Sequence, residues 1–137
     1  MRKTIAVIAV TTFSTVLYAF AAPAPGSLED TMKQVGATMG KLKKGLDGKM
    51  LHEAAGDAEK MQALLKDAEA IFAGMKMADA VEMAKSAESA AGDIVSAGHG
   101  GNAEGATAAF GKLGGTCKGC HDAHREKLQD GSYKLKP

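Results

Sequence analysis

The chain is short of the side chains that usually build a hydrophobic core. Its 137 residues include no tryptophan, four phenylalanines and two tyrosines, so only 4% of the sequence is aromatic. Residues 22–137 retain only Phe72, Phe110 and Tyr133. Because burial of large apolar side chains supplies much of the stability of a small domain, this composition predicts a thin core that needs help from another component.

An excess of charge is also missing. The chain carries 17 basic and 16 acidic residues, for a net charge of +1. Binding to DNA or RNA requires a basic stripe, and none is present, so we expect no nucleic-acid partner. A phosphate-binding loop is equally absent, because no Lys-Ser/Thr pair follows the glycines at 114–115.

The one long apolar run stands at the N-terminus. Residues 5–21 are apolar apart from serine and threonine and follow the basic pair Arg2-Lys3, which is typical of a secretory signal peptide. Ala19-Phe20-Ala21 provides a small-x-small cleavage site. The run is short for a membrane span of about 20 residues. We therefore predict a signal peptide at 1–21, a single mature domain at 22–137, periplasmic localisation and no stable membrane insertion after cleavage.

The only two cysteines stand in the run Cys117-Lys118-Gly119-Cys120-His121, and C-x-x-C-H is typical of c-type haem attachment. A thioredoxin-like dithiol would need a βαβ setting, and a Cys₂His₂ zinc site would need a second histidine pair. A plain disulfide is the remaining alternative. The export signal favours haem, so we predict one covalent haem c per chain, bound through Cys117 and Cys120, with His121 as an axial iron ligand.

Apolar residues recur at spacings of three and four in four segments, which predicts four amphipathic helices. They cover 28–47, 54–75, 77 to the turn at 98–102, and 103–128, and no segment shows a strand pattern. Ser27 and Asn102 are expected to cap the first and fourth helices, and Asp130-Gly131 is expected to end the fourth. The first helix carries the apolar positions Leu28, Met32, Val35, Met39, Leu42 and Leu46.

Four such helices joined by short turns predict an all-α fold, an antiparallel up-down-up-down four-helix bundle with haem bound between the first and last helices. Glycine is frequent inside these helices, and each glycine lowers helix stability by about 1 kcal/mol relative to alanine. Two interpretations stay open for Gly36, Gly114 and Gly115: close approach of the backbone to a flat macrocycle, or simple tolerance of a small residue.

The C-terminal helix with Cys117-x-x-Cys120-His121-x-x-x-Arg125, preceded by three helices and an export signal, resembles the class II c-type cytochromes, which include cytochrome c′ and cytochrome c556. Residues 38–43 are similar to the end of the first-helix motif of cytochrome c′, and residues 28–32 to the opening of cytochrome b562. One departure is His124, where the family usually has tyrosine or phenylalanine.

This resemblance implies a sixth iron ligand from the first helix. It places Met32 where the c556 and b562 proteins have their methionine ligand, and where cytochrome c′ often has a blocking side chain. Met39, one heptad further along, is the alternative ligand. Met61 and Met83 are expected in the core, His52 and His99 on the surface, and His124 near the haem edge. For Arg125 two roles stay open, a hydrogen bond to a haem propionate and a cap on the last turn.

The resemblance implies a one-electron carrier with His121 and Met32 as axial ligands, exchanging electrons with periplasmic donor and acceptor proteins, and not an enzyme. The alternative is a five-coordinate cytochrome c′ that binds or detoxifies nitric oxide. A structural helical bundle with a disulfide is the third hypothesis. A homodimer is compatible with the resemblance, because cytochromes c′ often dimerise.

Overall fold

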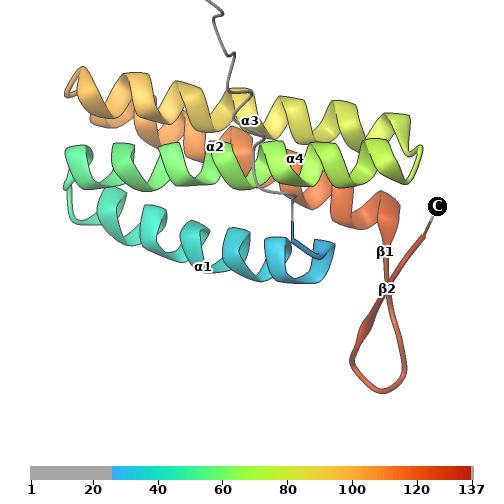
Figure 1. Ribbon diagram of the computed structural model, residues 1–137. Coiled ribbons are helices and arrows are strands. Elements are labelled where there is room, and N and C mark those ends of the chain that lie inside the picture. Colours follow the sequence, from blue (N-terminus) through green and yellow to red (C-terminus); the bar gives the residue numbers. More distant parts are fainter. Residues whose placement is uncertain (1–25, 137) are drawn as a thin grey trace, which may run out of the picture.

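A computed structural model describes residues 26–136, so the predicted signal peptide lies outside the described residues. Four helices are followed by a short antiparallel hairpin (Figure 1). The elements are α1 (Leu28–Asp47), α2 (Leu51–Gly74), α3 (Ala78–His99), α4 (Ala103–His124), β1 (Arg125–Lys127) and β2 (Tyr133–Leu135).

The helices alternate in direction, which confirms the predicted all-α, up-down-up-down bundle. Figure 1 shows the start of α1 and the end of α4 at the same end of the bundle, beside the hairpin. We call this the hairpin end. Consecutive helices pack against each other, whereas α1 approaches α4 much less closely than it approaches α2. The space between α1 and α4 is therefore the loosest part of the bundle.

Both predicted helix caps are present. The Ser27 hydroxyl oxygen accepts a hydrogen bond from the Asp30 backbone N–H at 3.1 Å and donates to the Asp30 carboxylate at 2.7 Å. The Asn102 side-chain oxygen accepts from the Gly105 N–H at 2.9 Å. These bonds satisfy backbone donors that a helix start leaves free, which explains why the first and fourth helices begin where the sequence predicts.

The three interhelical turns share one backbone pattern. In each, a residue in the left-handed region follows the helix cap, namely Lys49 with φ 55°, Lys76 with φ 60° and Gly101 with φ 69°. The N–H of the next residue then bonds to a carbonyl oxygen five residues back. This hydrogen bond is typical of right-handed helices that end in a residue with left-handed backbone angles. It lets the chain reverse direction within three residues.

The core is rich in alanine and divided into two clusters. Among the described residues, eleven of the eighteen buried apolar side chains are alanine. The larger cluster is built around Leu42, Met61, Ile94 and Leu113, and the smaller one, at the hairpin end, contains Phe72. Phe110 is half-buried against the larger cluster, while Tyr133 is 51% exposed. The thin core predicted from the aromatic content is confirmed.

The end of the chain differs from the prediction. Helix α4 stops at His124 instead of continuing to Leu128, and a hairpin follows where no strand was predicted. Leu128, expected on the buried seam, is 38% exposed. The reversal is stabilised locally, because the Asp130 carboxylate accepts a hydrogen bond from the Ser132 N–H and Gly131 takes φ 86°. Asp130-Gly131 thus forms a hairpin turn instead of a helix stop.

The helices pack most closely at the opposite end from the hairpin. A Cβ added at Gly98 would lie 2.8 Å from the Leu51 carbonyl oxygen, and one at Gly45 would lie 3.2 Å from the Ala54 Cβ. By contrast, a Cβ at Gly36, Gly114 or Gly115 would meet no atom within 4 Å. Close backbone approach therefore explains glycine at 45 and 98.

Within residues 26–136, no helix combines the length and the apolar character needed to cross a membrane.

Candidate functional site

A cavity of about 230 Å³ opens at the C-x-x-C-H motif. All four helices contribute to its walls, and Gly36 is the one glycine among the lining residues. They are Met32, Val35, Gly36, Met39, Leu65, Ala68, Phe72, Met83, Ala84, Ala87, Thr116, Cys117, Cys120, His121 and Arg125. The cavity separates the two core clusters, since each contributes residues to its walls. The apolar interior is thus interrupted at the sequence motif.

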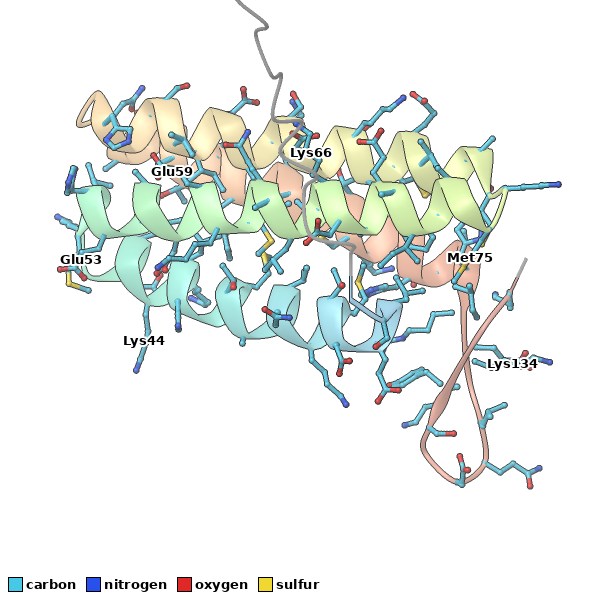
Figure 2. The ribbon with its side chains drawn as sticks, viewed as in Figure 1. Lys44, Glu53, Glu59, Lys66, Met75 and Lys134 are labelled. Atoms are coloured by element: carbon cyan, nitrogen blue, oxygen red, sulfur yellow. The ribbon has the colours of Figure 1, made fainter. Side chains whose placement is uncertain are left out.

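A second, larger cavity of about 650 Å³ adjoins the first at the hairpin end. The two share lining residues Met32, Phe72, Cys120, His121 and Arg125. The hairpin forms one wall of this second cavity, and Figure 2 labels Met75 at the end of α2 and Lys134 on the hairpin, both of which border it. The motif therefore faces a continuous space that runs from the bundle interior to its rim.

Cys117, Cys120 and His121 lie together on α4 because residues three and four apart share a helix face. All three are half-buried, and neither cysteine is in a disulfide. Burial raises the pKa of both thiols, with smaller contributions from Cys120 on Cys117 and from Asp79 on Cys120. Burial, followed by the charge of Arg125, lowers the pKa of His121. Each of these side chains is held in its neutral form.

Three methionines from helices other than α4 border the first cavity. Met32 and Met39 come from α1, as predicted, and Met32 borders both cavities. Met83, from α3, was expected in the core but is half-buried at the cavity wall. Its spacing of three from Ala80 and four from Ala87 indicates a position that faces the bundle interior, but it does not show that a cavity lies there. Met61 is fully buried, as expected.

His124 is one of the few buried polar residues, at 6% exposure. Its Nδ1 lies 3.3 Å from the Lys136 carbonyl oxygen, and its Nε2 lies 3.1 Å from an Asp79 carboxylate oxygen without being aligned for a hydrogen bond. It also borders the second cavity. His124 therefore links α4 to the start of α3 and to the C-terminal segment. His52 and His99 are exposed, as predicted.

Arg125 performs one of its two predicted roles in this structure. It is the C-cap of α4, where its backbone N–H donates to the His121 carbonyl oxygen. Its guanidinium carbon lies 3.6 Å from the centroid of the Tyr133 ring. The contact with Tyr133 was not predicted, because it depends on the hairpin.

The residues around the two cavities fit a c-type haem. Two thiols stand one helical turn apart, a neutral imidazole follows directly, and the remaining walls are largely apolar, as a flat porphyrin requires. The methionines Met32, Met39 and Met83, from α1 and α3, also border the first cavity. Among residues 26–136, no cluster of three or more His, Cys, Asp or Glu side chains is arranged to hold a metal ion.

A comparison with protein families finds a match in the same region. Residues 70–125 match the family described as cytochrome c′, from the end of α2 through α3 and α4 to Arg125. Comparison with curated proteins gives no significant match. The match contains the whole C-x-x-C-H run. Residues 70–125 of this four-helix bundle thus carry the features of the cytochrome c′ family, as expected of a class II c-type cytochrome.

Proposed function

We propose that this chain is a periplasmic class II c-type cytochrome that carries one electron at a time between redox proteins and is not an enzyme. The observation that carries the proposal is the position of C-x-x-C-H on the wall of an apolar cavity formed by all four helices. A motif in a solvent-exposed turn would offer no such enclosure.

Each motif residue has a role that its position supports. Cys117 and Cys120 would hold the porphyrin covalently by thioether bonds, one per chain, and His121 would bind the iron from the α4 side. A haem bound there supplies an iron that exchanges single electrons between its ferric and ferrous states. Burial lowers the pKa of His121 and so favours the neutral imidazole, whose lone pair is free for that bond.

Met32 is the proposed sixth ligand. It borders the cavity from α1, the helix that faces α4 across the loosest part of the bundle. Methionine opposite histidine raises the reduction potential, and a filled sixth position leaves no site for an external ligand. Both properties suit an electron carrier. Met32 packs against the buried apolar cluster that contains Phe72, so its surroundings are apolar.

Replacement of Met32 by alanine tests this ligation. The ferric wild-type protein should be low-spin with a sulfur-to-iron band in the near infrared, and its ferrous form should add carbon monoxide slowly or not at all. Met32→Ala should be high-spin, bind carbon monoxide readily and have a lower potential, because the sulfur ligand is lost. Absorption spectroscopy and redox titration measure these changes.

Met39→Ala and Met83→Ala are the matched controls, since both residues border the same cavity. They should keep the low-spin spectrum, with a stability loss of roughly 2 to 5 kcal/mol at most. Loss of the sulfur band in one of these variants, with an unchanged spectrum in Met32→Ala, would identify that residue as the ligand instead of Met32.

A second function is favoured by the family match itself, which is to cytochrome c′. In that hypothesis the iron is five-coordinate, Met32 crowds its open face, and the protein binds or detoxifies nitric oxide. A wild-type protein that is already high-spin and binds carbon monoxide would replace the carrier proposal with this one.

The proposed partners are periplasmic donor and acceptor proteins. The near-neutral charge of the chain provides no strong field to steer them. Exposed lysines lie in the second half of α1 and just after it, at positions 41, 44 and 49. Figure 2 labels Lys44, which lies far from the hairpin end of the bundle. Their place suits a solvated surface more than a docking site near the cavity.

A further inference from the structure

Arg125 and Tyr133 form a contact that the proposed function does not use. The guanidinium carbon of Arg125 stands 3.6 Å from the Tyr133 ring centroid, a cation–π geometry. Tyr133 is 51% exposed, so its ring contributes little to the core. In a domain with only three aromatic residues beyond position 26, one of them is thus placed under an arginine.

The hairpin that supplies Tyr133 is fixed to the bundle at its far strand. The Lys136 backbone N–H donates to the His124 carbonyl oxygen at 2.7 Å, and the Lys136 ammonium donates to the Asp122 carbonyl oxygen at 3.2 Å. The strands pair so that Arg125 stands opposite Leu135, and Lys127 opposite Tyr133. The ring of Tyr133 is therefore held at a fixed place relative to the end of α4.

Arg125, which Tyr133 contacts, lies at the mouth of the cavity. Arg125 borders both cavities and stands one helical turn after His121, close enough for its charge to contribute to the lowered pKa of that histidine. In the described part of the chain it forms no salt bridge with a carboxylate. Its charge is thus available to an acidic group at the mouth of the cavity.

An arginine side chain that is free to rotate loses conformational entropy when a ligand fixes it. A stacking contact limits that freedom before any ligand binds, which is the advantage of preorganisation. The attraction between the guanidinium and the face of the ring stabilises the stacked arrangement. This suffices to favour one orientation of the guanidinium.

We propose that the C-terminal hairpin is a positioning device, in which Tyr133 holds the guanidinium of Arg125 at the mouth of the cofactor cavity. There Arg125 binds a carboxylate side group of the cofactor and sets part of the reduction potential through its fixed positive charge. This inference rests on the proposed function, because it requires a haem with acidic side groups in the cavity. Arg125 is the binding residue, and Tyr133 acts through it.

The reduction potential of the haem-containing protein tests the inference. Arg125→Gln removes a positive charge beside the iron and should lower the potential, since a nearby cation favours the ferrous state. The expected shift corresponds to a roughly threefold to tenfold change in the ferric–ferrous equilibrium. Tyr133→Leu should lower the potential in the same direction, whereas Tyr133→Phe, which keeps the ring, should stay close to wild type.

A double variant separates positioning from a general effect of the hairpin. In the Arg125→Gln background, Tyr133→Leu should cause no further shift, because the residue through which it acts is gone. Lys127→Gln is the matched control for charge, since Lys127 is on the same strand and borders neither cavity. It should change the potential much less than Arg125→Gln. Equal shifts in Tyr133→Leu with and without Arg125, or none in either, would overturn the inference.

A measurement on the haem-free protein keeps this test separate from the proposed function. The contact with Tyr133 lies in the hairpin, outside the bundle interior that we expect to be loosely packed without haem. In the haem-free protein the Arg125 Nε–H group should therefore be more ordered on the nanosecond timescale in the wild type than in Tyr133→Leu, by NMR relaxation. Equal mobility in both proteins would refute the positioning role even if haem is attached. A wild-type protein that takes up no haem would refute the proposed function while an ordered Arg125 still supported the contact with Tyr133.

Discussion

At the scale of single residues, burial keeps the attachment motif neutral. It is the main reason that the pKa values of Cys117 and Cys120 are raised and that of His121 is lowered. A neutral imidazole has a free lone pair, and a protonated thiol is a poor nucleophile and a poor metal ligand. Burial therefore favours the thiol over the thiolate form of both cysteines in the haem-free chain.

The thiols of the haem-free protein should therefore react slowly. We expect the alkylation rate of Cys117 and Cys120 by iodoacetamide to rise at a higher pH in the folded than in the unfolded chain, because burial raises both pKa values. Mass spectrometry after timed alkylation at a series of pH values measures the midpoint. The urea-unfolded chain is the control, with a midpoint at about pH 8.5, the value of an unperturbed thiol. Equal or faster reaction in the folded protein would contradict this environment.

At the scale of elements, backbone approaches backbone closely at the end of the bundle opposite the hairpin. Gly98→Ala would place a methyl group 2.8 Å from the Leu51 carbonyl oxygen, so backbone must move. We expect a loss of about 1 to 3 kcal/mol in the free energy of unfolding. Gly56→Ala, where nothing lies within 4 Å, should instead stabilise by up to about 1 kcal/mol.

Urea unfolding of the two glycine variants, followed by far-ultraviolet dichroism, measures both changes. Opposite signs support the close approach of α3 to α2 at Gly98. Stabilisation by both substitutions would mean that the helices are further apart there than the structure places them.

The elements also show what local sequence can and cannot predict. The helices were predictable because periodicity and the capping residues Ser27 and Asn102 act within a few residues. The hairpin was missed because Arg-Glu-Lys in β1 has no strand pattern, and its partner strand is fixed by bonds from Lys136 to the end of α4. Asp130-Gly131 was recognised as a break, but not as a turn.

Some residues of the candidate site were likewise predictable from the sequence, and others were not. Cys117, Cys120 and His121 were found from their spacing, and Met32 from a family resemblance. The position of Met83 on the cavity wall and the contact of Arg125 with Tyr133 depend on how distant segments pack. No local pattern carries that information.

At the scale of the whole molecule, the cavity separates two parts of a weak core. Seven of the thirteen buried residues of the larger cluster are alanine, and the smaller one at the hairpin end contains Phe72 as its one large buried side chain. A haem that buries several hundred Å² would add on the order of 10 kcal/mol at about 25 cal/mol per Å². The cofactor would thus join the two clusters into one core.

The haem-free protein should accordingly be helical but loosely packed. We expect a native-like far-ultraviolet dichroism spectrum, binding of a hydrophobic dye, and a low and broad thermal transition compared with the haem-containing form. Calorimetry and dye fluorescence on the two forms make the comparison. A haem-free protein that melts as sharply and at the same temperature would show that the alanine core is sufficient alone.

The central claim is covalent haem attachment at Cys117 and Cys120, and extraction of the exported protein tests it most directly. The protein is produced in a host with haem-ligation machinery and treated with acidified organic solvent, which removes haem that is not covalently bound. We predict that the wild-type protein keeps its haem, on a proteolytic peptide containing residues 117–121. The double variant Cys117→Ala with Cys120→Ala should lose it. A colourless wild-type protein with two free thiols from the same host would contradict the account.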